Sequence, residues 1–161
     1  MQKIQFFIVL VVILAITGCG PAGLKTQFVE GIVTLDGQPL EGALVTYVPV
    51  QQTPENVSAS GLTDEAGRYT LTAIGATISG ATGRGAPEGD YVVTIVKRET
   101  IDTGPRRSSD GSVALTSDGE VEMATITRMV TPQLYSIPNT TTLRATVQRG
   151  NNDIPFNIES R

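Results

Sequence analysis

The stretch GIVTLDGQPLEGALVTYVP, residues 31–49, decides the fold class of this chain. Its two ends are rich in β-branched residues, which favour strands, and the segment between them carries two glycines and a proline. This pattern predicts two adjacent strands joined by a turn. Similar runs at 57–63 and 68–72 flank the turn sequence DEAG, and we expect a further strand at 90–97.

Two segments near the end of the chain alternate between apolar and polar residues. They are LRATVQ at 143–148 and IPFNIE at 154–159, and the turn-rich sequence RGNND separates them. Period-two alternation predicts half-buried antiparallel strands, and Pro155 places the last one at a sheet edge because proline cannot donate to a ladder. Seven strands with frequent turns predict an all-β domain of two sheets packed face to face.

The same alternation predicts which side chains point inward. In several of these strands every second residue is apolar and faces the expected core. The predicted core residues are Val33, Leu35, Leu40, Val45, Tyr47, Tyr69, Leu71, Tyr91, Val93, Ile95, Leu143, Val147, Ile154, Phe156 and Ile158.

The composition of the chain excludes several classes of function. The 161 residues suit a single domain, with 12 Lys and Arg against 16 Asp and Glu. We expect no nucleic-acid partner, because the chain has no dense basic run beyond Arg106 and Arg107. With no histidine and one cysteine, a Ser-His-Asp hydrolase, a cysteine protease and a zinc site all lack their required groups. We therefore expect no catalytic residue, no metal and no cofactor.

The first 18 residues differ from the rest of the chain. Lys3 precedes an apolar run from Phe6 to Ile16, which would be roughly 16 Å long as a helix and too short for a hydrocarbon core of about 30 Å. A basic start, a short apolar run and small residues are typical of a signal peptide, here residues 1–18.

The sole cysteine, Cys19, follows the sequence Ile16-Thr17-Gly18. This segment resembles the bacterial lipobox, which implies lipidation of Cys19 and a membrane-anchored protein of the bacterial envelope. Several acyl chains give a stable anchor where one gives marginal binding. Residues 19–27 would form a lipidated tether, and Gly20 in place of aspartate points to the outer membrane. An intermolecular disulfide is the alternative use of this thiol.

From residue 28 the sequence resembles the carboxypeptidase regulatory-like, or transthyretin-like, family. The likeness lies in the segments GIVTLDGQPLEGALVTYVP, GLTDEAGRYTLT and APEGDYVVTIV and in the closing LRATVQRGNNDIPFNI. It implies a seven-stranded antiparallel β-sandwich of immunoglobulin-like or prealbumin-like type over 28–161. Because these motifs are mainly turns and core positions, they imply a fold and hardly any activity.

Two regions exceed a minimal sandwich. Residues 73–86 are glycine-rich and predict a mobile loop. Residues 98–131 form a longer insertion, in which SVALTSDGEVEMATI predicts a hairpin turning at Asp118 and Gly119. Long loops on a rigid scaffold often carry recognition. A candidate binding rim therefore comprises Arg106, Arg107, Asp110, Asp118, Glu120 and Glu122, with a solvated insertion as the alternative.

Two further interpretations concern side-chain chemistry. Asp64 would cap the DEAG turn, with Gly67 at positive φ, rather than join Glu65 and Asp90 in a calcium loop. Lys97 and Asn157 could form an isopeptide crosslink in a small adhesin-like domain.

The leading hypothesis is a non-enzymatic, lipid-anchored structural or binding module. The alternative is a carbohydrate- or peptide-binding accessory lipoprotein of an envelope degradation complex, with an envelope protein or polysaccharide as partner.

Overall fold

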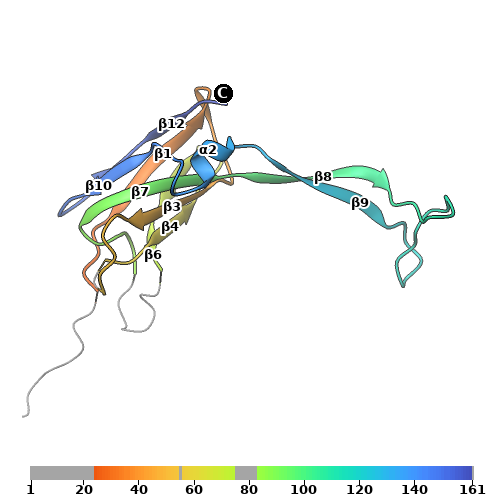
Figure 1. The fold of residues 1–161 in the computed structure, drawn as a ribbon, viewed down its shortest axis with the longest axis horizontal. Coiled ribbons are helices and arrows are strands. Elements are labelled where there is room, and N and C mark those ends of the chain that lie inside the picture. Colours follow the sequence, from red (N-terminus) through yellow and green to blue (C-terminus); the bar gives the residue numbers. More distant parts are fainter. Residues whose placement is uncertain (1–23, 55, 75–82, 161) are drawn as a thin grey trace, which may run out of the picture.

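The computed structural model describes residues 24–54, 56–74 and 83–160. These residues form two five-stranded sheets, a separate two-stranded ribbon and one short helix, α2 (Gln133–Ser136). The two larger sheets pack together as a sandwich, from which the ribbon extends (Figure 1). The fold is therefore all-β, as the alternation of apolar residues predicts.

The first sheet is built around β1, which has neighbours on both sides. The strands β11 and β12 run parallel to β1, whereas β2 and β5 run antiparallel to it. The bounds of these strands are β1 (Val29–Leu35), β2 (Gln38–Pro39), β5 (Arg68–Thr70), β11 (Asn152–Asp153) and β12 (Phe156–Ile158).

The second sheet is antiparallel throughout, in the order β10-β7-β3-β4-β6. Its central strands are β7 and β3, and both its edges are short strands. The bounds are β3 (Leu44–Pro49), β4 (Ala59–Leu62), β6 (Thr72–Ala73), β7 (Gly89–Val96) and β10 (Arg144–Val147).

The prediction that the two halves of 31–49 are adjacent strands is wrong, because β1 and β3 lie in different sheets. Asp36 and Gly37 both have positive φ, so the chain folds back at once and β2 pairs with β1. Gly42, with a φ of 67°, then directs the chain toward the second sheet. The buried side chain of Leu40 lies between these two turns.

The DEAG turn also joins the two sheets rather than two paired strands. The strand before it, β4, belongs to the second sheet, and β5 after it pairs with β1. The expected strand 68–72 divides, because β6 returns to pair with β4. Several expected strands are split in this way, and the described residues contain twelve strand segments.

The last two expected strands were predicted to be antiparallel. This is correct for β10, which pairs antiparallel with β7, but wrong for β12, which runs parallel to β1. The link between them crosses from one sheet to the other, so the chain arrives beside β1 in the same direction. Pro155, whose missing N–H needs an unpaired position, lies exposed between β11 and β12.

The core lies between the two sheets and contains most of the predicted residues. Three of the fifteen predicted core residues, Leu35, Leu143 and Ile154, are only partly buried but pack against the cluster. Aromatic rings join the sheets, since the Tyr47 ring centroid lies 6.5 Å from that of Tyr69 and 6.3 Å from that of Phe156. The sandwich is thus fixed by apolar contacts that span both layers.

The glycine-rich region 73–86 is ordered where the structure describes it. Residues 75–82 lie outside the described ranges. Arg84 pairs with Thr72, and the Gly85 amide donates to the Leu71 carbonyl at 2.7 Å. Gly85 has a φ of 90°, and a Cβ there would lie 1.8 Å from the Gln27 carbonyl oxygen. Residues 83–86 thus hydrogen-bond to Gln27 and to residues 71–73, and the close backbone approach at Gly85 requires glycine.

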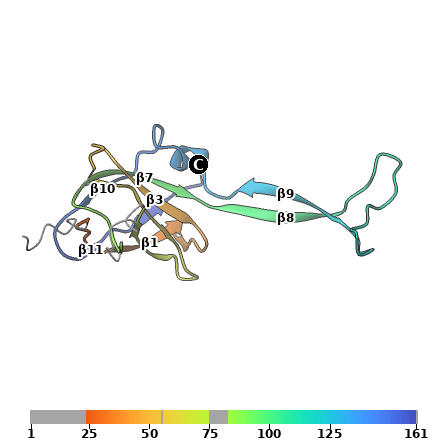
Figure 2. The same cartoon turned by 90° about the horizontal axis from the view of Figure 1, so that it is seen from below.

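The insertion forms a long hairpin arm. The strand β8 (Arg98–Pro105) follows β7 almost directly and pairs antiparallel with β9 (Met123–Met129). In both views the arm points away from the sandwich (Figures 1 and 2). Eight residues at about 3.3 Å each make β8 roughly 26 Å long. No helix in the described ranges is long and apolar enough to span a bilayer.

Candidate functional site

The arm ends in a forked tip, formed by residues 106–122. The Arg106 amide donates to the Glu122 carbonyl, the Ala114 amide to the Arg106 carbonyl, and the Glu122 amide to the Ala114 carbonyl. These three backbone bonds, 2.7 to 2.9 Å long, close a junction from which two small hairpins branch. The second hairpin turns at Asp118 and Gly119, as the sequence predicts, and Gly119 has a φ of 85°.

All six predicted rim residues lie on this tip. Arg106 and Glu122 flank the junction, and the Arg106 guanidinium donates to the Glu122 carboxylate at 2.5 Å. Both side chains are exposed, so this ion pair adds little stability. Arg107 lies in the first hairpin and donates to the Gly111 carbonyl at 3.0 Å.

Two of the acidic rim residues, Asp110 and Asp118, accept hydrogen bonds within the tip. The Asp110 carboxylate accepts from the Ser112 hydroxyl at 2.6 Å and from the Ser112 amide at 2.9 Å. These hydrogen bonds lower the pKa of the Asp110 carboxyl. Asp118 accepts from the Ser117 hydroxyl, and Glu120 pairs with Thr116 through its backbone. The structure thus brings the six residues to one tip without converging their charged groups on a single point.

Sequence reasoning missed the apolar residues of the arm. Val113, Leu115 and Val121 lie exposed on the tip, and Leu115 and Val121 pair across the second hairpin. The relative exposure of Leu115 is 60% and that of Val121 is 47%. The strand β8 was also missed, although the alternation in RETID could have indicated it.

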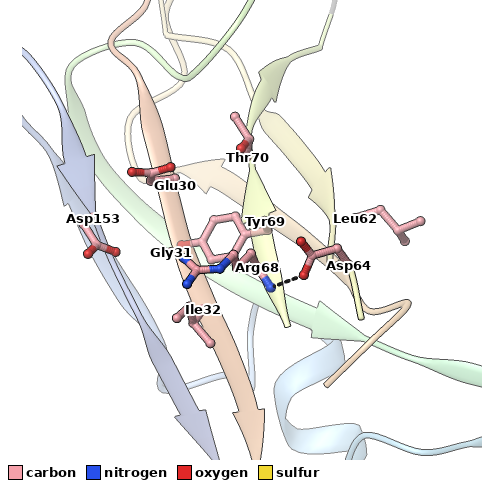
Figure 3. Close-up of a pocket in the computed structure, with 9 residues that line it drawn as sticks. All are labelled: Glu30, Gly31, Ile32, Leu62, Asp64, Arg68, Tyr69, Thr70 and Asp153. Carbon is pink, nitrogen blue, oxygen red and sulfur yellow. Dashed lines mark hydrogen bonds between the residues drawn. The ribbon is translucent and has the colours of Figure 1, made fainter. Parts of the chain in front are cut away.

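A shallow depression of about 380 Å³ lies on the first sheet (Figure 3). Arg68 and the carboxylates of Glu30 and Asp153 point into this region from neighbouring strands. Gly31 forms part of its floor, where a Cβ would lie 2.2 Å from the Ile154 carbonyl oxygen. The residues that line the depression are Glu30, Gly31, Ile32, Leu62, Asp64, Arg68, Tyr69, Thr70 and Asp153.

The carboxylate of Asp64, at one side of this depression, caps the DEAG turn. One of its oxygens accepts from the Arg68 amide at 2.8 Å, as Figure 3 shows, and from the Ala66 amide at 2.9 Å. Gly67 has the expected positive φ of 73°, so the prediction of a capped turn is confirmed. Asp90 accepts instead from the Thr146 hydroxyl. Within the described residues, no group of three or more Asp, Glu or Cys side chains is arranged to hold a metal ion.

The two residues of the isopeptide hypothesis have different partners. The Lys97 ammonium lies 3.2 Å from the Glu99 carboxylate at the base of the arm. The Asn157 side chain accepts from the Thr34 hydroxyl at 2.7 Å on the first sheet. A crosslink would require each side chain to leave these contacts.

The predicted signal peptide and Cys19 lie outside the described residues, but the place where the chain joins the sandwich is clear. Gln27 and Ala86 exchange backbone hydrogen bonds of 2.7 and 3.0 Å. The Gln27 side chain also donates to the Glu88 carboxylate. These contacts lie just before β7 begins, whereas the arm starts where β7 ends. The chain therefore joins the sandwich at the end opposite to the arm.

These features define an all-β sandwich that carries a projecting hairpin. No family model matches the sequence, and comparison with curated proteins found no match. Among solved structures, a 9R-lipoxygenase from Cyanothece PCC8801 is similar at a TM-score of 0.34 and 12% identity. The match covers 83% of this chain and 16% of the lipoxygenase chain. A likeness this weak bears on neither the fold nor the activity.

Proposed function

We propose that this protein is a lipid-anchored, non-enzymatic binding module of the bacterial envelope, which holds a hairpin arm away from the membrane. The proposed scaffold is a carboxypeptidase regulatory-like sandwich with seven principal strands in an immunoglobulin-like or prealbumin-like arrangement. The proposed anchor is Cys19, because the sequence around it resembles a lipobox.

The position of the arm carries this proposal. Gln27 joins the sandwich beside the start of β7, and Lys97 leads into the arm from the other end of that strand. An anchor on the tether at 19–27 would thus place the sandwich between the membrane and the arm. β7 and β8 together contain sixteen strand residues, so the tip would lie about 50 Å from the point where the chain joins the sandwich.

The charged side chains support a non-enzymatic role. Asp64 caps a turn, Arg106 and Glu122 pair with each other, and Asp110 binds Ser112. In the described residues every fully buried side-chain nitrogen and oxygen has a hydrogen-bond partner within the protein, as expected of groups that stabilise the fold. The open depression on the first sheet has a mixed polar lining, unlike the enclosed apolar pockets typical of small-molecule sites.

The chemistry of the arm favours a protein partner over a polysaccharide. Residues 98–131 contain no Phe, Tyr or Trp, so the arm has no aromatic ring on which a sugar could stack. It offers free strand backbone and exposed aliphatic side chains instead, which suit pairing with another polypeptide. A carbohydrate-binding accessory lipoprotein is the alternative, with the polar groups of the tip as its contact surface.

Deletion of residues 100–128 tests the role of the arm. Lys97 and Val130 already share a backbone hydrogen bond of 2.9 Å, so the shortened chain can close at the base of the arm. The variant should stay membrane-bound and retain its sandwich but lose binding to envelope proteins, measured with purified envelope fractions. Loss of binding to envelope polysaccharides instead would favour the alternative. Unchanged binding would place the interaction surface on the sandwich and refute the proposed role of the arm.

A further inference from the structure

The two edges of the arm differ in how they are protected from pairing with another strand. On β8, Pro105 has no N–H to donate, and a bulge interrupts the strand between Asp102 and Gly104. Thr103, at this bulge, turns its hydroxyl back to donate to the Ala124 carbonyl at 3.0 Å. Proline and bulges are the usual means of blocking an exposed edge. β9 contains neither feature.

The outer edge of β9 carries unpaired backbone groups. The Val130 amide donates to the Lys97 carbonyl, and the Arg106 amide donates to the Glu122 carbonyl. These two bonds determine which residues of β9 direct their backbone N–H and C=O groups toward β8. The backbone N–H and C=O groups of the alternate β9 residues therefore point away from β8. These residues are Met123, Thr125, Thr127 and Met129. Among the described residues no strand other than β8 pairs with β9.

The faces of the arm are also poorly covered. Ile126 pairs with Ile101 across the ribbon and is still 55% exposed. Met123 and Met129 on the opposite face of β9 are exposed as well. An isolated two-stranded ribbon is only marginally stable in water, and further strands are needed to cover its apolar residues. The arm therefore has both a free edge and apolar surface to bury.

We propose that β9 pairs antiparallel with β9 of a second copy of this chain, about a two-fold axis at Ile126. The product is a four-stranded sheet in the order β8-β9-β9-β8. Only this axis overlaps the full length of Met123–Met129 with itself, because Ile126 is the midpoint of the strand. It also brings the outward backbone groups of the two strands into register, with Thr125 opposite Thr127 and Met123 opposite Met129.

The side chains of β9 are complementary to themselves in this register. Arg128 is the only charged residue in β9, and it lies opposite Ala124 of the second copy rather than opposite another Arg128. Its guanidinium keeps its ion pair with Glu99 on β8, at 3.5 Å. On the same face, Ile101 and Ile126 from both copies form one continuous row across the four strands, which buries exposed apolar surface.

The same register brings more apolar surface together beyond the strands. Continued past Met123, it sets Val121 at the level of Thr131 of the second copy. The tip of each arm then lies at the base of the other arm, near α2. The tip exposes Leu115 and Val121, and the segment around α2 exposes Leu134 and Ile137. These contacts add apolar area on either side of the strand pairing.

This inference rests on the proposed role of the arm as the interaction surface, but not on lipidation. Because the paired arms point in opposite directions, the two tethers leave from opposite ends of the dimer, so copies that hold their arms away from the membrane would pair across two facing membrane surfaces. Disulfide trapping in the full chain tests it. At the two-fold axis the Cα atoms of Ile126 and its copy would be about 4.5 Å apart, so Ile126→Cys should crosslink on mild oxidation. Ile101→Cys is the matched control, because it lies on the same face but about 14 Å from its copy across three strand spacings.

The expected result is a disulfide-linked band at twice the monomer mass for Ile126→Cys. Wild-type protein, whose sole thiol is Cys19, gives the background. Arg128→Cys should also stay at background, because a different residue lies opposite it. If Ile126→Cys gives no more crosslinked dimer than Ile101→Cys, the pairing is refuted. The arm-deletion binding assay would still report separately on the proposed function.

A pair of proline variants tests the same interface without a crosslink. Thr127→Pro removes an N–H that points out from β9, whereas Thr100→Pro removes the equivalent N–H on β8. Neither N–H contributes to the ladder within the arm. Sedimentation of the full chain in detergent should show a dimer for wild type and Thr100→Pro and a monomer for Thr127→Pro. A wild-type monomer, or equal masses for the two variants, would overturn the proposal.

Discussion

The hydroxyl oxygen of Tyr47 lies 3.0 Å from that of Tyr69, so a hydrogen bond links the two sheets through the core. Tyr69 donates its proton to the Ile154 carbonyl at 2.6 Å. Because a phenol has a single proton, Tyr47 must be the donor to Tyr69. The two rings and this directed chain of hydrogen bonds connect β3, β5 and the segment before β12.

Removal of the central hydroxyl should destabilise the sandwich. Tyr69→Phe leaves both the Tyr47 hydroxyl and the Ile154 carbonyl without this partner, at an expected cost of about 1–3 kcal/mol in the free energy of unfolding. Tyr47→Phe is the matched control, since Tyr69 can still donate to Ile154. Urea unfolding should rank the two variants in this order. A larger loss in Tyr47→Phe would contradict the assigned direction.

The buried tyrosines should also make the protein sensitive to alkali. Burial raises the pKa of Tyr47 and of Tyr91 to about 12, and it raises the pKa of Tyr69 as well. In the unfolded chain these groups titrate near 10. The unfolded state therefore binds fewer protons above pH 10, and stability present below that pH should be lost as the pH rises toward 12.

Urea midpoints measured across this range check the alkaline prediction. The midpoint should fall as the pH rises above 10, and the absorbance of native protein should show tyrosine ionisation delayed relative to protein in denaturant. Tyr91→Phe removes one of the raised groups and should reduce the slope. A midpoint that does not change between pH 9 and about 11 would rule out a contribution from these residues.

A charge at Phe156 should unfold the domain. Its ring is buried and packs against Tyr47 and Tyr69, so Phe156→Asp both removes the ring and buries a carboxylate. The combined loss should exceed about 4 kcal/mol and abolish a cooperative thermal transition. Asn157→Asp is the control, because that side chain is exposed and can still accept from Thr34. A wild-type melting point for Phe156→Asp would contradict the core assignment.

Gly67 should tolerate no side chain, for two separate reasons. Its φ is 73°, and a Cβ there would lie 2.5 Å from the Val33 carbonyl oxygen. Gly111, in the arm tip, has a φ of 85° but open space around the same position. Gly111→Ala should cost about 1–2 kcal/mol from backbone strain alone, and Gly67→Ala should cost clearly more. Chemical unfolding of the two variants measures the difference, and equal losses would show that the clash is relieved.

Local patterns in the sequence predicted the buried residues well but not their partners. Tyr69 lies between Arg68 and Thr70, and Ile154, Phe156 and Ile158 occupy every second position of their segment, so their direction follows from the period of a strand. Whether two consecutive strands share a sheet depends on turns of one or two residues. The positive φ of Gly42 moves the chain to the other sheet, and no alternation pattern records that step.

The arm shows the same limit for the candidate site. The tip hairpin at Asp118 and Gly119 was predictable, because its turn chemistry is local. The pairing of Ile101 with Ile126 was not predictable, because the forked tip of residues 106–122 separates the two strands in the sequence and no simple turn sets their register. The charge of the polar rim residues is evident from the sequence. The exposure of the aliphatic residues is not, because it depends on the arm extending away from the sandwich.

The anchoring role proposed for Cys19 gives the last prediction. Cys19→Ser removes the thiol that would carry the lipid but changes nothing in the described sandwich, which begins its hydrogen bonding at Gln27. The variant should therefore leave the membrane fraction, or remain unprocessed, while its sandwich melts as in the wild type. Membrane fractionation, intact mass and thermal melting measure these three properties. A Cys19→Ser protein that is processed and membrane-bound like the wild type would show that the anchor lies elsewhere, since a single unlipidated tether has too little apolar area to hold the domain at a bilayer.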